Sequence, residues 1–155
     1  MIYIGIDPGK DGAIAIIPEN DMYLNDIKIY HFEDDYIQII KEIHNHCSQC
    51  ICYMERVHAL PGNGVKQAFA FGENYGYIRG ILESFLIPYQ TVPPQTWKKE
   101  FSLDSDKQHS IQCAKQLFPG VDLKRTQRCK TEHDGKAEAL LLAEYARRKY
   151  ARHKH

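Results

Sequence analysis

Residues 1–17 read MIYIGIDPGKDGAIAII, and this stretch decides the fold class. Isoleucine at every second position over 2–6 is typical of a strand, and the GKDG of 9–12 predicts a turn. The apolar run 13–17 predicts a second strand, so the stretch as a whole predicts a β-hairpin. Asp7 ends the first strand and is followed by Pro-Gly, which places a carboxylate at one edge of the predicted sheet.

Beyond the hairpin, strand and helix patterns alternate along the chain. Strand patterns occur at 24–30, 51–54 and 89–92. Helical patterns begin after Asp34 and Asp35, after the Pro/Gly loop 57–64, at Pro93 and Pro94, at Ser105 as an N-cap, and near Asp134. The 155 residues contain no repeat and no low-complexity linker, so we expect one α/β domain, a mixed sheet with helices on its faces.

Charge is distributed unevenly, although the formal net charge is zero. Residues 1–90 carry 6 Lys and Arg against 12 Asp and Glu, or −6, while residues 91–155 carry 14 against 8, or +6. This asymmetry predicts an acidic metal centre beside a basic surface that binds a polyanion. A solvated basic tail would explain only Arg147 to His155.

Composition also bears on the compartment. The N-terminal residues lack the basic start and apolar run of a signal peptide, and no stretch approaches the roughly 18 apolar residues of a membrane span. Five cysteines, an odd number, favour reduced thiols over a disulfide framework. We therefore expect a soluble protein with no membrane partner, in the cytoplasm of a bacterium or of a phage-infected host, with an organelle as the alternative.

Four carboxylates fall where such a fold would gather them. Glu55 ends the apolar strand ICYM, and Asp134 and Glu138 are four residues apart, so both can face one side of the last helix. Carboxylates brought from distant segments repel one another unless cations hold them together, so Asp7 and these three acids predict a metal-dependent enzyme. The alternative is that Asp134 caps the helix and Glu138 favours its positive end.

Several motifs occur together in the order of a known family. They are GIDPG at 5–9, the acid that ends the central strand, a glycine-containing helix, Pro-x-x-Trp-Lys-Lys at 94–99, Asp-Lys-Gln at 106–108, and an acid-led Ala-Glu-Ala-Leu helix. In these motifs, over almost its whole length, the chain resembles the RuvC-type Holliday junction resolvases, a branch of the ribonuclease H-like superfamily. The last helix, DGKAEALLLAEY at 134–145, is most similar to the phage and chloroplast-type branch.

The resemblance implies a ribonuclease H-like mixed β-sheet flanked by helices, forming a single nuclease domain over 1–155. It implies a Mg²⁺-dependent, structure-selective DNA endonuclease that resolves four-way junctions by paired symmetric nicks. Two Mg²⁺ per active site would lie about 3.5–4 Å apart, with Mn²⁺ as a substitute. The implied catalytic and metal-binding residues are Asp7, Glu55, Asp134 and Glu138.

The last helix departs from the bacterial pattern of the family. Bacterial RuvC proteins space the two acids of this helix three apart, whereas here the spacing is four and His133 lies just ahead. Three roles therefore remain open for Asp134: direct ligation, ligation through water, or helix capping while His133 assists proton transfer.

Basic and aromatic residues supply the expected DNA contacts. Phosphate-binding residues are predicted at Lys98, Lys99, Lys107, Lys124, Arg125, Arg128 and Lys130. Phe69, and with it Phe71, is predicted to stack on unpaired bases at a branch point, with a place in the core as the alternative. Trp97 is predicted to be a packing residue.

The expected partners are a four-way junction or other branched DNA and a second copy of the chain. A junction has two-fold symmetry, so a C2 homodimer with two active sites matches it. Gly72, Gly76 and Gly80 predict a helix face that allows close approach, either to that second copy or to the sheet.

Other interpretations remain. One is a ribonuclease H-like nuclease that acts on other branched DNA or on RNA–DNA hybrids, and another is a non-catalytic junction-binding protein. The His and Cys residues of 44–52 resemble a zinc knuckle, but they are not arranged as two separated ligand pairs, so we interpret these cysteines as small apolar residues.

Overall fold

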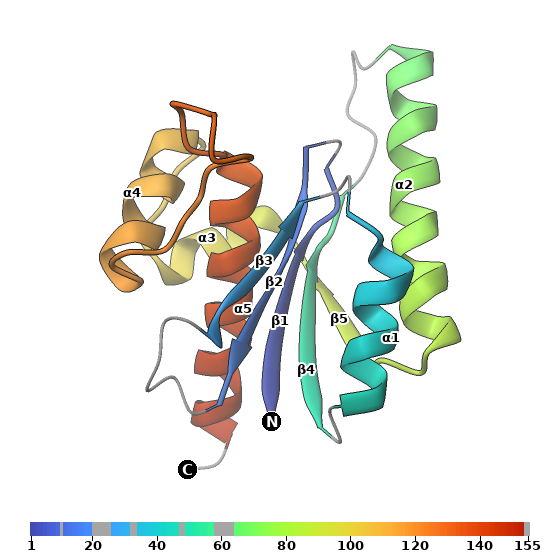
Figure 1. Ribbon diagram of the computed structural model, residues 1–155. Helices are drawn as coiled ribbons and strands as arrows, with labels where there is room; N and C mark the ends of the chain where they lie inside the picture. The colour runs from blue at the N-terminus through green and yellow to red at the C-terminus, as the bar shows by residue number, and fades with distance from the viewer. Residues whose placement is uncertain (10, 20–25, 32–33, 47–48, 58–63, 154–155) are drawn as a thin grey trace.

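The computed structural model describes residues 1–9, 11–19, 26–31, 34–46, 49–57 and 64–153. Five strands form one sheet in the order β3-β2-β1-β4-β5 (Figure 1). The strands are β1 (Ile2–Asp7), β2 (Ala13–Pro18), β3 (Lys28–His31), β4 (Cys50–Glu55) and β5 (Tyr89–Val92). The helices are α1 (Tyr36–His46), α2 (Val65–Ser84), α3 (Pro94–Glu100), α4 (Lys107–Leu117) and α5 (Asp134–His153).

The sheet is mixed, and its central strands bring two acids to the same edge. β1 and β2 form the predicted antiparallel hairpin, in which Asp7 pairs with Ala13. β1 and β4 are parallel, with Ile6 opposite Met54, and β4 and β5 are also parallel. Because parallel neighbours have their carboxyl ends at the same edge, Asp7 and Glu55 lie next to each other there.

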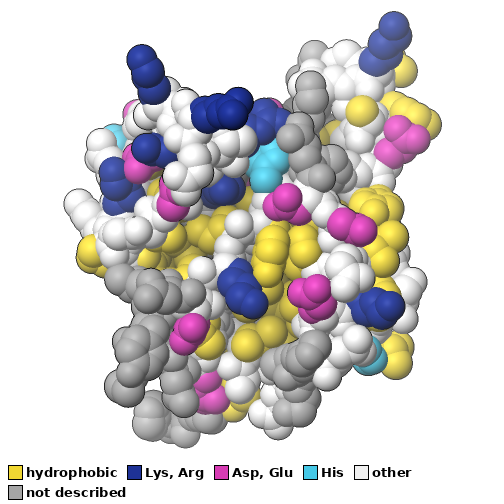
Figure 2. All heavy atoms as spheres, viewed as in Figure 1, with side chains coloured by type: hydrophobic (Ala, Val, Ile, Leu, Met, Phe, Trp, Pro, Cys, Tyr) yellow, Lys and Arg dark blue, Asp and Glu magenta, His cyan; other side chains and the backbone are white. Residues whose placement is uncertain are grey.

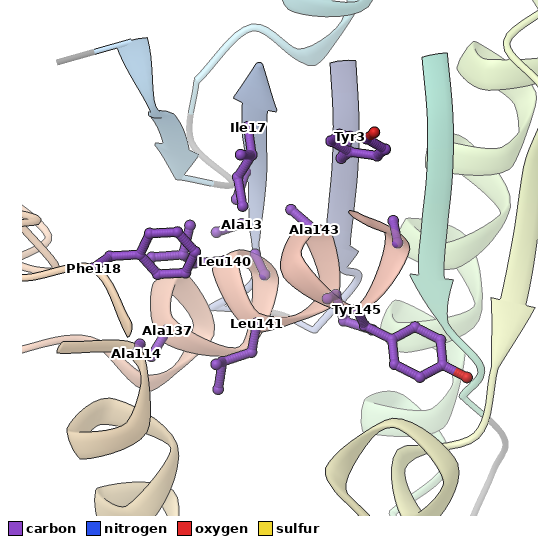
Figure 3. Close-up of a cluster of buried hydrophobic side chains, with 14 of the residues drawn as sticks. Tyr3, Ala13, Ile17, Ala114, Phe118, Ala137, Leu140, Leu141, Ala143 and Tyr145 are labelled. Carbon is purple, nitrogen blue, oxygen red and sulfur yellow. The ribbon is translucent and has the colours of Figure 1, made fainter. Parts of the chain in front are cut away.

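One face of the sheet is covered by α5. Leu140 and Ala143 of this helix point toward the strands that carry Tyr3, Ala13 and Ile17 (Figure 3). The approach is close, because a Cβ atom added at Gly5 of β1 would overlap the backbone of α5. The helix is long and buried for most of its length, so its packing on the sheet fixes where its N-terminal acids lie relative to the strands.

The other face of the sheet is covered by α1 and the C-terminal half of α2. Tyr36, Ile39, Ile40 and Ile43 of α1 pack on the isoleucines of β1 and β2, and Ile78, Ile81 and Leu82 of α2 join the same cluster. These last three are the buried residues of α2, and the N-terminal part of the helix rises beyond the sheet (Figure 1).

Most predicted elements are confirmed, with two differences. The predicted strand 24–30 is observed as Lys28–His31, and residues 20–25 lie outside the described part of the chain. The prediction that Ser105 caps α4 was wrong, because Asp106 occupies the cap and its Oδ1 accepts a hydrogen bond from the Gln108 N–H at 2.9 Å.

Among the described residues, no helix is both long enough and apolar enough to span a bilayer.

Candidate active site

The four predicted acids converge at one cleft. The cleft has a volume of about 990 Å³ and lies between the carboxyl edge of the sheet, the start of α5 and the protruding part of α2. Its lining residues are Asp7, Gly9, Asp11, Glu55, Val57, Lys66, Gln67, Ala70, Phe71, Glu73, Asn74, Tyr77, Lys107, Asp134 and Glu138. The two acids of α5 both face the cleft, as a four-residue spacing on a helix allows.

Asp7 is the most strongly perturbed of the four. Burial raises its pKa to about 8, and the negative charges of Glu55, Glu138 and Asp134 act in the same direction. The Gly9 N–H donates to Asp7 Oδ1 at 3.0 Å and opposes part of this shift. Such a carboxyl group ionises readily only when a positive charge is brought to it.

Glu55 is held by a residue that the sequence analysis interpreted as packing alone. The indole of Trp97 is fully buried, and its Nε1–H donates to Glu55 Oε2 at 2.8 Å. Burial raises the pKa of Glu55 to about 7, although the bond from Trp97 and the charge of Lys98 oppose the shift. Trp97 therefore packs as predicted and also orients an acid of the site.

Lysine ammonium groups lie against the two acids of α5. Lys98 Nζ is 2.7 Å from Glu138 Oε1, which also accepts a hydrogen bond from Ser110 Oγ at 3.3 Å. Lys107 Nζ is 2.5 Å from Asp134 Oδ2. Burial alone would raise the pKa of Asp134, but the hydrogen bond and charge of Lys107 outweigh it, and the pKa is lowered.

This donor set suits hard divalent cations. Carboxylate oxygens are the ligands that Mg²⁺ and Mn²⁺ prefer, and four carboxylates line this cleft. The pKa values of Asp7 and Glu55 are raised chiefly by burial and further by the charge of neighbouring acids, and Lys98 and Lys107 lie against the two acids of α5.

The predicted phosphate contacts divide into two groups. Lys98 and Lys107 reach into the acidic cluster, and only 16% of the Lys98 side chain is exposed. The others lie outside the cluster: Lys99, Arg125, Arg128 and Lys130 are exposed, and Lys124 is half-buried. Figure 2 shows Lys and Arg side chains gathered over α4 and the loop that precedes α5. One of the loop residues, Arg125, lies 4.0 Å from Asp11 at the cleft.

The two phenylalanines of α2 have different positions. Phe71 lines the cleft, whereas Phe69 is 67% exposed and is not among the lining residues. On the helix Phe69 shares a face with Val65, Gly72 and Gly76. The described atoms leave open space within 4 Å of a Cβ at each of the predicted glycines, so this face does not pack on the sheet.

Asn74 is a site residue that the sequence analysis missed. Its Nδ2–H donates to the carbonyl oxygen of Pro8 at 2.7 Å and ties α2 to the turn that follows Asp7. Its Oδ1 is buried without a hydrogen-bond partner among the described residues, at a position that lines the cleft. The one available signal was helical spacing, since Asn74 is four and seven residues before the buried Ile78 and Ile81.

The segment 44–52, which resembles a zinc knuckle, lies partly outside the described residues, which include neither Cys47 nor the side chain of His46. Cys52 is buried in the core and Cys50 is half-buried, and neither forms a disulfide within the described part of the chain. Burial raises the pKa of the Cys52 thiol, as expected for a small apolar residue.

Comparison with solved structures identifies the class of fold. The five-stranded mixed sheet with its flanking helices is the ribonuclease H-like α/β fold of RuvC. A Thermus thermophilus RuvC structure superposes with a TM-score of 0.58 at 17% identity, covering 96% of this chain and 97% of that one. T. thermophilus RuvC in complex with a Holliday junction substrate superposes with a TM-score of 0.61 at 13% identity, covering 99% and 96%.

The predicted resemblance is therefore confirmed in the fold. No protein-family model matches the sequence, and no curated protein matches it either.

Proposed function

We propose that this protein is a Mg²⁺-dependent endonuclease that cuts four-way DNA junctions by paired symmetric nicks. The observation that carries the proposal is the convergence of Asp7, Glu55, Asp134 and Glu138 on one open cleft with a basic rim. Buried carboxylates repel a polyanionic substrate unless cations lie between the carboxylates and the phosphates of that substrate. The likeness of the fold to RuvC supports the choice of substrate.

The four acids are the residues that would hold two Mg²⁺ ions, with Mn²⁺ as a substitute. When bound, such ions activate a water molecule and stabilise charge on the phosphate and the leaving oxygen. The fit rests on the donor chemistry, because all four acids offer carboxylate oxygens, and those of Asp7 and Glu55 have raised pKa values that a cation would lower.

The chain's own residues prepare this cleft for DNA. Trp97 fixes one oxygen of Glu55, and the Gly9 N–H fixes one oxygen of Asp7. Asn74 holds the turn after Asp7 against α2. Lys98 and Lys107 form ion pairs with the two acids of α5. We propose that these lysines turn to the DNA phosphates when divalent cations bind to the acids.

We also propose a homodimer formed through α2. Val65 is 86% exposed and Phe69 is 67% exposed, and the open positions of Gly72, Gly76 and Gly80 continue the same face. A flat, small-residue helix face suits close contact with its own copy across a two-fold axis. Two active sites related in this way would meet the two opposed strands of a junction.

The test is cleavage of a labelled four-way junction in Mg²⁺, beside linear duplex, Y-fork and RNA–DNA hybrid controls. The proposal expects symmetric nicks in the junction alone and none in EDTA. Cutting of forks or hybrids would leave the metal chemistry intact and change the substrate. Metal-independent binding without cleavage would show a junction-binding protein instead of an enzyme.

A further inference from the structure

A second group of metal-ligating side chains lies beside the acidic cluster and shares no residue with it. Asp11, in the turn between β1 and β2, His31, at the end of β3, and His133, just before α5, each offer a ligand atom, and these atoms lie within 4.8 Å of one another. The three residues are far apart in sequence, and the fold brings them to one point.

The arrangement of the two imidazoles suits a shared ion. The ring centroids of His31 and His133 are 5.0 Å apart, and the ring planes are at 87°. Two imidazoles bound tetrahedrally to one Zn²⁺, with Zn–N of about 2.0–2.1 Å, have centroids about 5 Å apart. The ring spacing therefore matches a shared ion, which would draw the ligand atoms closer together than the 4.8 Å within which they now lie.

Burial strengthens this reading. His31 is only 6% exposed, and the backbone N–H of His133 donates to the Leu123 carbonyl at 2.8 Å, so both residues are held in place. The Nδ1 of His133 is buried and has no hydrogen-bond partner among the described residues. A buried ring nitrogen without a partner is costly, and coordination of a metal would satisfy it.

We propose that Asp11, His31 and His133 form a binding site for a transition-metal ion of the Zn²⁺ class, distinct from the Mg²⁺ site of the four acids. Two imidazoles and one carboxylate are preferred by Zn²⁺ and related ions over Mg²⁺, and water completes the coordination. The Asp11 side chain is 61% exposed, so an ion can enter from the solvent side.

The site would tie together three elements around the active site. The backbone of Asp11 lies so close to Gly135 in the first turn of α5 that a Cβ there would overlap its carbonyl oxygen, and this Cβ would lie 3.2 Å from Asp7 Oδ2. An ion held by Asp11 and His133 would therefore fix the start of α5 against the turn that follows Asp7. The bound ion would replace the ion pair between Arg125 and Asp11, whose charged atoms lie 4.0 Å apart.

The experiment measures Zn²⁺ bound to the full chain by calorimetric titration in excess Mg²⁺, which saturates the four acids. The proposal expects one Zn²⁺ per chain, and a visible Co²⁺ spectrum with the intensity of a four- or five-coordinate site. Asp11→Asn should weaken the binding by at least about tenfold. His133→Asn should abolish it.

Control variants separate this site from the others. His44→Asn alters the 44–52 segment and Glu55→Gln alters the acidic cluster, and both should bind Zn²⁺ as the wild type does. Because Asp11 is exposed, Asp11→Asn can be judged even if the histidine variants unfold. Zn²⁺ binding that persists unchanged in Asp11→Asn and His133→Asn would overturn the proposal, as would the absence of binding in the wild type. Neither result depends on DNA cleavage, so the proposed nuclease function is tested separately.

Discussion

At the scale of single residues, the site is defined by two carboxyl groups that the fold keeps from ionising freely. The pKa of Asp7 is raised to about 8 and that of Glu55 to about 7, in both cases chiefly by burial. The hydrogen bonds donated by Trp97 and by the Gly9 N–H offset part of this shift and hold the carboxylate oxygens in fixed directions. A site that is unfavourable when empty of cations is well suited to binding them.

Replacing either acid by its amide should separate binding from cleavage. Asp7→Asn and Glu55→Gln each remove a negatively charged ligand with little change of shape, so we expect cleavage to fall by at least about a thousandfold, or roughly 4 kcal/mol of transition-state stabilisation. Junction affinity should stay within a few-fold of wild type in gel-shift assays. Glu73→Gln, which alters an acid on the α2 wall of the same cleft, is the control and should retain activity.

The raised pKa values also predict how stability depends on pH. The unfolded chain ionises these groups near 3.8 and 4.5, and the folded chain near 8 and 7, so the folded state binds more protons between about pH 4 and pH 8. Without divalent metal, the stabilising contribution of these two groups should therefore be fully present below about pH 4 and be lost as pH rises to 8, by up to about 1.4 kcal/mol per pH unit for each excess proton.

Urea unfolding in EDTA at several pH values measures this slope. Asp7→Asn should flatten it, and Mg²⁺ should restore stability most strongly at high pH, because it binds the ionised carboxylates. A metal-free protein that became more stable between pH 5 and pH 8 would contradict the assigned pKa shifts.

The bond from Trp97 can be removed without emptying the core. Trp97→Phe keeps an aromatic ring but loses the Nε1–H that donates to Glu55, so Glu55 becomes free to rotate. We expect the Mg²⁺ concentration for half-maximal cleavage to rise about tenfold, in the range observed for residues that orient metal ligands. Phe101→Leu, in the same aromatic pair with Trp97, is the control, because it changes the packing and keeps the bond.

At the scale of elements, the regular patterns of the sequence were enough for most helices and strands, whereas contacts between distant segments were not. Alternating isoleucines predicted β1, and acids four apart predicted which face of α5 meets the cleft. The bond between Trp97 and Glu55 joins residues 42 positions apart and depends on how α3 docks beside β4, which no local pattern encodes. The cap of α4 was misplaced because Ser105 and Asp106 are both good capping residues.

The protruding part of α2 gives a prediction about assembly. Gly76 has open space around its Cβ position among the described atoms, so Gly76→Leu should leave the monomer at least as stable, because glycine costs a helix about 1 kcal/mol relative to better helix formers. If α2 packs closely on its copy, the same change should shift the protein from dimer to monomer in light scattering. Ser84→Leu, exposed on the same helix beyond the glycine series, should leave the dimer intact. An unchanged dimer in Gly76→Leu would place the interface elsewhere.

At the scale of the whole molecule, the two halves of the chain contribute opposite charge to one surface. Asp7 and Glu55 of the first half lie at the carboxyl edge of the sheet. From the second half, Lys98, Lys107 and Arg125 pair with acids at or beside this cleft. Net neutrality therefore conceals a local arrangement in which, under the proposed function, DNA would meet cations first and acids only at the point of cleavage.

This arrangement predicts a steep dependence of junction binding on salt. Each phosphate contact contributes about −0.9 to the slope of log affinity against log salt concentration on duplex arms. Replacing both Arg128 and Lys130 by Gln should make the slope shallower by about 2 and weaken junction binding, with little change in thermal stability because both side chains are exposed. Lys41→Gln on α1 is the control for loss of one cation. A slope identical to that of the wild type would remove this loop from the DNA interface.

The contact between β1 and α5 has a further consequence for the acidic cluster. Gly5 lies two residues before Asp7, and α5, which carries Glu138, rests directly on it. The distance between Asp7 of β1 and Glu138 of α5 is thus set by Gly5, a residue that bears no functional group. A single added methyl group at this position would act as a wedge, opening the spacing of the carboxylates while leaving every one of them present.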